Sequence, residues 1–350
     1  MRRVTTLASA LVAGALVLTA CGGSSGGTGT TTPKSSTSSS PKSSLKVGMA
    51  YDIGGRGDQS FNDAAAAGLD KATAELGITS KEAEASNGEA DSAKEERLRV
   101  LAQAGYNPVI AVGFAYSAAV AKVAKEMPDT HFAIIDDEAA VGDNITNLVF
   151  AEEQGSFLVG AAAALKTKKD NIGFIGGVDV PLIHKFEAGY EAGAKAVTPN
   201  IKVQVKYLTQ PPDFSGFGDP AKGKTAAAGM YDAGADIVYA AAGGSGAGVF
   251  EAAKAAKGLA IGVDSDQYKT ADPSVQSVIL TSMLKRVDVA VFDYIKNATT
   301  GNYASGTVRY DLSKDGVGYA TSGGQVDDIA TKLDDFKQKI ISGEITVPTK

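Results

Sequence analysis

The 350-residue chain has a single cysteine, no tryptophan and only two histidines. One cysteine excludes a disulfide framework and a structural zinc site built on thiolates, and two histidines leave little for a histidine-rich metal centre. An excess of positive charge is also lacking, because 34 lysines and arginines stand against 40 aspartates and glutamates without a basic cluster. This balance disfavours a nucleic-acid partner. We therefore expect no metal, no cofactor and no bound nucleic acid.

The residues that are present describe a globular chain with a large core. Hydrophobic residues make up 44% of the chain and charged residues 21%, which is typical of folded rather than disordered proteins. The length exceeds that of most single domains and favours two compact units. The 41 glycines indicate many tight turns between strands and helices.

The N-terminus has the features of an export signal. Two arginines follow Met1, an apolar stretch runs over residues 7–18, and Leu18-Thr19-Ala20 precede Cys21. The apolar stretch is too short to span a membrane, so residues 1–20 are predicted to be a signal peptide. Residues 18–21, Leu-Thr-Ala-Cys, resemble a bacterial lipobox, and this resemblance implies that Cys21 is lipidated. An ordinary secretory signal is disfavoured because the only cysteine lies at the cleavage point.

The segment that follows is predicted to be a flexible tether. Residues 22–44 contain only Gly, Ser, Thr, Pro and Lys, which cannot bury enough apolar surface to offset the entropy of ordering. We assign residues 21–45 to the lipidated cysteine and this tether. The folded body is thus expected on the extracytoplasmic face of the cell membrane, held by its lipid.

The body alternates between short apolar and amphipathic stretches. Strands connected by helices of this length form right-handed βαβ units and doubly wound parallel sheets. The fold class is therefore α/β, with two parallel-sheet lobes joined by a hinge: residues 46–148 with 283–306, and residues 149–282 with 307–350. Strands are predicted at 45–50, 82–85, 108–112, 131–135, 147–150, 171–176, 203–207, 236–240, 259–263 and 276–280. Helices are predicted at 60–76, 91–104, 117–126, 153–165, 182–197, 218–233, 246–256 and 287–297.

Ligands of open α/β sheets bind beyond the carboxyl ends of the strands, and the loops there are rich in carboxylates, amides, aromatics and glycines. Such groups suit a neutral ring-containing ligand with many hydrogen-bond donors, and suit a phosphate poorly. The candidate positions are Asp52, residues 54–62, Phe114 and Asp136 in the first lobe, and residues 179–186, 243–246 and 264–267 in the second.

Other kinds of site find weaker support. The run at 243–248 could bind an anion through backbone amides or could simply be a tight turn, but it matches the dinucleotide pattern loosely and no P-loop motif is present. No G-x-S-x-G motif occurs. The carboxylate pairs Asp136-Asp137 and Asp264/Asp266 could serve acid–base or metal chemistry, although accepting ligand hydrogen bonds is the simpler interpretation.

Six segments along the body carry a resemblance to a known family. They are VGMAYDIGG at 47–55, DQSFN at 58–62, EEQGSFLVG at 152–160, IGFIGG at 172–177, IGVDSDQ at 261–267 and TSMLK at 281–285. In this order and spacing they resemble the basic membrane protein family, the substrate-binding lipoproteins of nucleoside ABC transporters. The resemblance covers the chain from residue 46 onward.

This resemblance implies a type I periplasmic-binding-protein clamp that binds a nucleoside, with a preference for purines. It also implies that the protein is a monomer with an ABC permease as its partner. It further implies roles for individual residues. Phe61 and Phe186 would sandwich the base, Asp136 would bind the base edge, and Asp264 with Lys285 would hold the ribose hydroxyls. The remaining members of the predicted site are Asp52, Ser60, Asn62, Phe114, Gly243 and Gly244.

Three alternatives to a nucleoside receptor were weighed. The same clamp could bind a sugar or a small signalling metabolite, since two stacking aromatics also suit a pyranose. A surface nucleoside hydrolase is disfavoured because no clustered metal ligands or poised base are visible. A sugar-repressor-like regulator would need a DNA-binding headpiece where this chain has the lipobox and tether. We therefore expect a binding protein and not an enzyme.

Replacing the single cysteine tests the anchor. Cys21→Ala should leave the body folded but release it from membranes, because acyl chains contribute about 0.8 kcal/mol per buried methylene to membrane binding. Detergent-phase partitioning of wild type and variant measures this. Equal partitioning of the two would contradict the lipid anchor.

Overall fold

The computed structural model describes residues 43–86 and 88–350. The predicted signal peptide, Cys21 and most of the tether lie outside these residues. Within the described part of the chain, none of the helices combines the length and the apolar character needed to cross a membrane.

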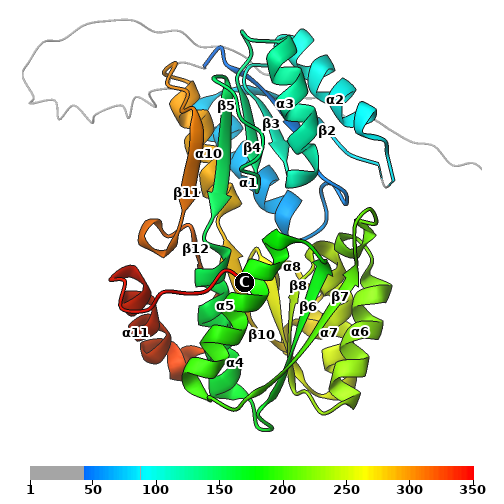
Figure 1. The fold of residues 1–350 in the computed structure, drawn as a ribbon, viewed down its shortest axis with the longest axis vertical. Coiled ribbons are helices and arrows are strands. Elements are labelled where there is room, and N and C mark those ends of the chain that lie inside the picture. Colours follow the sequence, from blue (N-terminus) through cyan, green and yellow to red (C-terminus); the bar gives the residue numbers. More distant parts are fainter. Residues whose placement is uncertain (1–42, 87) are drawn as a thin grey trace, which may run out of the picture. The chain divides into compact units, whose positions relative to one another are not determined.

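The first sheet has six parallel strands in the order β11-β5-β4-β3-β1-β2. Its central strands are buried along their whole length, as expected for a sheet covered on both faces. The strands are β1 (Lys46–Ala50), β2 (Thr79–Ala83), β3 (Val109–Val112), β4 (Phe132–Ile135), β5 (Ile145–Phe150) and β11 (Gly306–Tyr310). Its helices are α1 (Phe61–Leu76), α2 (Asp91–Gln103), α3 (Ser117–Glu126) and α10 (Val287–Ala298), which packs against α1 (Figure 1).

The second sheet repeats this arrangement in the order β12-β10-β9-β8-β6-β7. It differs from the first sheet at one edge, where β12 is antiparallel to β10. The strands are β6 (Asn171–Val178), β7 (Lys202–Thr209), β8 (Ile237–Ala241), β9 (Leu259–Asp264), β10 (Ile279–Lys285) and β12 (Val317–Tyr319). The helices are α4 (Glu152–Lys166), α5 (Pro181–Val197), α6 (Pro220–Asp232), α7 (Gly246–Ala256), the short α8 (Gln267–Thr270) and α9 (Pro273–Gln276), and α11 (Ala330–Ile341).

The chain passes between the two sheets three times. It leaves the first sheet after β5, returns to it after β10, and leaves it again between β11 and β12. The lobe boundaries expected at 148/149, 282/283 and 306/307 fall inside β5, β10 and β11. Each of these strands is hydrogen-bonded along its whole length to one sheet. The chain therefore changes sheets only after the strands end, at Phe150, Lys285 and Tyr310.

The predicted alternation of strands and helices is confirmed up to β9, and α3 and α7 have the predicted bounds. The short helices α8 and α9 were not predicted, and the strand expected at 276–280 lies later, as β10 at 279–285, because residues 273–276 form α9. Helix α10 again lies where a helix was predicted. The elements after residue 298 have no counterpart in the prediction. Four of the five residues of β11 are not buried, and β12 has only three residues. Neither has the continuous apolar run that identifies a buried strand in a sequence.

Helices α4 and α5 pack backbone against backbone through glycines. A Cβ atom at Gly193 would lie 1.9 Å from the carbonyl oxygen of Phe157, and one at Gly160 would lie 2.1 Å from that of Tyr190. Glycine is therefore required at this contact. The close approach matters for function because α4 begins directly after the first passage between the sheets.

We expect Gly193→Ala to lower the free energy of unfolding by at least about 1–3 kcal/mol, because the added methyl group must push the two helices apart. Gly229→Ala in α6 is the matched control, since a Cβ there meets nothing within 4 Å. It should stabilise by up to about 1 kcal/mol through helix propensity. Chemical denaturation measures both, and equal stability of the two variants would contradict the close-packing argument.

Candidate ligand-binding site

A cavity lies between the carboxyl ends of the strands of the two sheets. Its empty volume is about 670 Å³, which includes space open to solvent, and both lobes contribute to its lining. Nine of the eleven predicted site residues line it; Ser60 and Gly244 do not. The nine are Asp52, Phe61, Asn62, Phe114, Asp136, Phe186, Gly243, Asp264 and Lys285.

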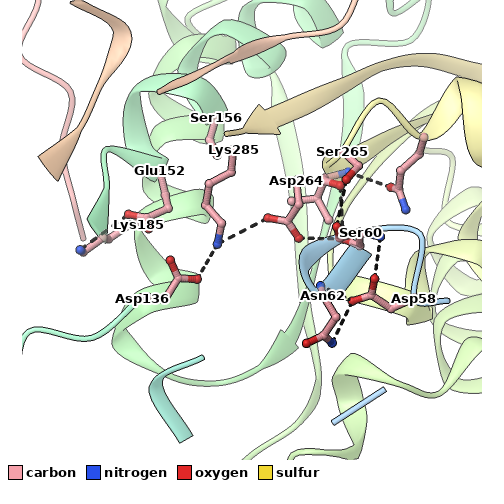
Figure 2. Close-up of polar contacts among 12 residues, drawn as sticks. Asp58, Ser60, Asn62, Asp136, Glu152, Ser156, Lys185, Asp264, Ser265 and Lys285 are labelled. Carbon is pink, nitrogen blue, oxygen red and sulfur yellow. Dashed lines mark hydrogen bonds and ion pairs between the residues drawn. The ribbon is translucent and has the colours of Figure 1, made fainter. Parts of the chain in front are cut away.

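The centre of the site is a buried ammonium group between two carboxylates from different lobes. Lys285, at the end of β10, has its Nζ 2.5 Å from Oδ2 of Asp136 and 3.5 Å from Oδ1 of Asp264 (Figure 2). The three side chains are 4%, 4% and 7% exposed. Burial lowers the pKa of Lys285, but the surrounding carboxylates outweigh this and raise it, so the lysine is charged. Burial raises the pKa of Asp136, and Lys285 opposes that rise.

Each of the two aspartates keeps one oxygen available. Oδ1 of Asp136 and Oδ1 of Asp264 are buried and make no hydrogen bond within the described residues. Buried polar atoms normally have partners, so an unpaired acceptor at a cavity wall is suited to receive a ligand's O–H or N–H group. Both aspartates therefore offer hydrogen-bond acceptors to a ligand.

The same two aspartates share an unusual backbone conformation. Asp136 directly follows β4 and Asp264 ends β9, which hold equivalent positions in the two sheets, and both have φ of +63°. Left-handed backbone is uncommon outside glycine and concentrates at functional sites, although aspartate tolerates it better than most residues. The repeated conformation is consistent with a shared role in the site.

The loop between β1 and α1 is held by the side chain of Asp58. Its carboxylate accepts hydrogen bonds from the backbone N–H groups of Ser60, Asn62 and Asp63 at 2.8–3.1 Å. It thus caps the start of α1, a common use of aspartate at a helix N-terminus. Burial raises the pKa of Asp58 to about 6, and these backbone donors oppose the rise.

Asn62 positions this loop as well as lining the cavity. Its Oδ1 accepts from the backbone N–H of Asp52 at 3.1 Å, and its Nδ2 donates to the carbonyl of Ile53 at 3.3 Å. Asp52 in turn lies against Gly113, where a Cβ would come within 2.3 Å of Oδ2 of Asp52. Burial raises the pKa of Asp52 to about 6.

Arg56 ties the outer side of the same loop to its neighbours. Its guanidinium makes a bidentate pair with Asp70 of α1 at 2.8 and 3.0 Å and a further bond to Glu82 of β2 at 2.6 Å. Bidentate pairs fix geometry as well as contributing energy. Arg56 therefore restrains the glycine-rich turn in front of Phe61.

Ser60 and Gln59 join the two lobes instead of lining the cavity. The Ser60 hydroxyl donates to Oδ2 of Asp264 at 2.7 Å, and its carbonyl accepts from the Ser265 hydroxyl at 2.9 Å. The carbonyl of Gln59 accepts from Nε2 of Gln267 at 3.0 Å. Three hydrogen bonds thus hold the start of α1 against the end of β9.

Aromatic rings from both lobes surround the cavity. Phe61 lies over the Lys285 ammonium, with its ring centroid 4.5 Å from Nζ, and Phe114 meets Phe214 of the other lobe edge-on at 5.9 Å. Phe186 is only 2% exposed, whereas Phe217 is partly exposed. Phe217 therefore presents more ring surface than Phe186.

Nine further lining residues are not among the eleven predicted site residues, although Asp58, Leu182 and Ile183 lie in the candidate loops 54–62 and 179–186. Phe214 and Phe217 follow β7, so the strand-end rule that selected the other loops would also have found them. None of the predicted site positions lies in the loop after the strand at 203–207. The nine are Ile53, Asp58, Gly113, Leu182, Ile183, Phe214, Phe217, Ala241 and Val263.

Neither histidine belongs to the cavity lining. His131 stacks on Tyr303 with ring centroids 3.7 Å apart, and His184 bonds to Asp179 at 2.7 Å. In the described ranges, 43–86 and 88–350, no group of three or more His, Cys, Asp or Glu side chains could hold a metal ion.

These features define a two-lobed substrate-binding protein with its ligand cavity between two parallel sheets. A model of the family described as ABC transporter substrate-binding protein PnrA-like matches residues 45–350, and the chain belongs to this family.

Individual relatives agree with this membership. The chain is 37% identical to the CD4+ T-cell-stimulating antigen of Listeria monocytogenes over 98% of this chain and 97% of the relative. It is also 37% identical to the ABC transporter nucleoside-binding protein BmpA of Lactococcus lactis, over 88% and 90%. The crystal structure of a solute-binding protein of an ABC transporter system from Aeropyrum pernix superposes with a TM-score of 0.76 at 29% identity, covering 87% of this chain and 94% of that one.

Lys285→Met should lower the free energy of unfolding by about 3–5 kcal/mol, because it leaves Asp136 buried without its charged partner. Without the lysine, the pKa of Asp136 in the folded state rises further above its unfolded value, so the folded state gains protons at low pH. The loss should therefore be smaller at pH 5 than at pH 8. Denaturant unfolding at the two pH values measures it.

Lys224→Met is the control for this experiment, since its ion pair with Glu251 has both side chains more than half exposed. Such a pair contributes about 0–1 kcal/mol. A Lys285 variant as stable as this control would show that the buried charges do not depend on one another.

Proposed function

We propose that the chain is the lipid-anchored, extracytoplasmic receptor of an ABC transporter, which captures a nucleoside, preferably a purine nucleoside, in the interlobe cavity and delivers it to the permease. The observation that carries this proposal is the buried Asp136–Lys285–Asp264 cluster beneath Phe61, in which one oxygen of each aspartate makes no hydrogen bond within the described structure. The printed name of the Lactococcus lactis relative, a nucleoside-binding protein, supports it.

Base recognition is assigned to the aromatic rings and Asp136. Phe61 would cover one face of the base, and Phe186 together with Phe217 would cover the other from the second lobe. Stacking of a base on an aromatic ring contributes about 1–3 kcal/mol. Oδ1 of Asp136 would accept from an N–H group on the edge of the base.

Ribose recognition is assigned to Asp264 and Lys285. Oδ1 of Asp264 would accept from a ribose hydroxyl, and the Lys285 ammonium would donate to a neighbouring oxygen. Charge-assisted hydrogen bonds of this kind contribute about 1.5–3 kcal/mol. A 2′-deoxynucleoside should therefore bind more weakly than the ribonucleoside.

The charges of the lining favour a nucleoside over a nucleotide. Four carboxylate side chains line the cavity, from Asp52, Asp58, Asp136 and Asp264, against the single ammonium of Lys285. A phosphate group would add negative charge to this surplus without a paired cation. The hydroxyl and amine groups of a nucleoside, in contrast, can donate hydrogen bonds to these four carboxylates.

Capture would work by closure of the lobes on the ligand. Ligand groups that contact both lobes stabilise the closed form relative to the open one, so binding shifts a conformational equilibrium and involves no chemical step. The bonds of Ser60 and Gln59 to the second lobe are contacts that favour closure. The closed shape would then be recognised by the permease, with the lipid on Cys21 keeping the monomeric body at the membrane.

The proposal is tested by calorimetric titration with adenosine, guanosine, inosine, cytidine and uridine, together with inosine monophosphate, free ribose and glucose. Nucleosides should bind and the nucleotide and sugars should not.

Phe61→Ala and Phe217→Ala should each weaken nucleoside binding about tenfold to a hundredfold through lost stacking. Phe186→Ala should weaken binding and also lower the unfolding temperature, because its ring is buried in the core.

The same samples decide between the alternatives. Tight binding of ribose or glucose with unaltered affinity in the Phe variants would favour a sugar receptor. Chromatography of the incubated nucleoside tests for catalysis: intact nucleoside is expected, and free base formed in proportion to the protein would show a hydrolase.

A further inference from the structure

Glu152 is a buried carboxyl group beside the site that the proposed function leaves without a role. It is the first residue of α4, directly after the chain passes from the first sheet to the second, and its side chain is 1% exposed. Neither of its carboxylate oxygens makes a hydrogen bond within the described residues. Such isolation is unfavourable for a charged carboxylate and calls for an explanation.

Charged and titratable groups face Glu152 from four elements. Lys185 of α5 lies with its Nζ 3.7 Å from Oε2 of Glu152 (Figure 2). Asp136 beyond β4 and Lys285 of β10 act on Glu152 through their charges, and Glu152 acts in turn on the buried phenol of Tyr239 in β8.

Lys285 is the charge that these carboxyl groups share. It faces Asp136, Asp264 and Glu152, and all three raise its pKa. Burial raises the pKa of Glu152 to about 8, the charge of Asp136 adds to the rise, and Lys285 and Lys185 oppose it. The three carboxylates face two ammonium groups, those of Lys285 and Lys185, so the cluster has one excess negative charge, which a proton on one carboxylate removes.

We propose that Glu152 is a positioning residue whose carboxyl group holds a proton in the closed protein, so that nucleoside capture takes up a proton. Because the protonated carboxyl group is neutral, it does not compete for the Lys285 ammonium, which then pairs with Asp136 and Asp264. This inference rests on the proposed closure around a nucleoside. Asp136 belongs to the first lobe, whereas Glu152, Lys185 and Lys285 lie on the second. Opening would remove the charge of Asp136 and admit water to Glu152, and both changes weaken its hold on the proton.

The sign of the pH dependence follows from this difference. The closed form binds more protons than the open form between the ordinary pKa of glutamate, about 4.3, and the pKa of about 8 in the closed structure. Affinity should therefore fall as the pH rises through this window, by at most about tenfold per pH unit for one proton. The stability of the inosine-bound chain should fall in the same direction, because Glu152 has its ordinary pKa when unfolded.

The experiment is titration of the full chain with inosine at pH 6, 7 and 8 in buffers of different ionisation enthalpy, which yields the number of protons taken up. Wild type should take up about 0.5–1 proton per inosine at pH 7. Glu152→Gln should take up none, and should bind inosine at pH 8 more tightly than wild type by at least about tenfold, and by up to about a thousandfold if Glu152 has its ordinary pKa in the open form. Lys185→Met should move the midpoint of the wild-type pH profile upward, because Lys185 favours the ionised form.

Glu153→Gln is the matched control in the same turn of α4. Glu153 is also buried, but its Oε1 pairs with Arg309 at 2.6 Å. This variant should lose stability and keep the proton uptake. A structural effect of losing any buried glutamate would appear in both variants, whereas a change in proton uptake should appear in Glu152→Gln alone.

A second readout separates this inference from the proposed function. Unfolding of the inosine-saturated chain between pH 5 and 9 should show stability falling with pH in wild type and less so in Glu152→Gln. If inosine binds without proton uptake, or if the two profiles coincide, the coupling is wrong while the receptor function stands. If no nucleoside binds, the proposed function is wrong, and the inference that rests on it is overturned as well.

Discussion

The site depends on one buried ammonium group. Lys285 meets Asp136 from the first lobe and Asp264 from the second, at the end of a strand where the chain passes between the sheets. A buried charge is tolerated only with partners of opposite sign. These partners come from both lobes, so the pairing that satisfies the lysine also draws the lobes together.

This arrangement explains why binding and closure would be one event. Each aspartate uses one oxygen in a hydrogen bond within the protein, Asp136 toward Lys285 and Asp264 toward Ser60. The other oxygen of each makes no hydrogen bond within the described residues, although Oδ1 of Asp264 lies 3.5 Å from the Lys285 ammonium. A nucleoside that fills both free acceptors would add to contacts that already cross the cleft. The surplus of carboxylates in the lining then favours uncharged ligands with many hydrogen-bond donors and disfavours anionic ligands.

The surrounding scaffold places these groups with little freedom. Glycines let α4 and α5 approach until their backbones touch, which fixes the start of α4 where Glu152 lies. Asp58 caps α1 and Arg56 holds the outer turn of the same loop, so Phe61 is presented from a restrained helix terminus. Function and stability therefore share the same residues.

The sequence by itself determined the two-lobed α/β fold, because buried parallel strands and amphipathic helices have distinct and periodic patterns. It also identified half of the residues that line the cavity, since ligands of such sheets bind at the strand ends and Asp52, Asp136 and Asp264 lie there. It did not reveal β11, β12 or α11, whose short or exposed stretches lack a strong pattern, nor the residues at which the chain changes sheets. Only the tertiary structure decided that Ser60 joins the lobes, that Phe186 is almost fully buried while Phe217 is partly exposed, and that Glu152 is buried beside Lys185 without a hydrogen bond. These are facts about distances between residues far apart in the chain, and local sequence patterns carry no information on them.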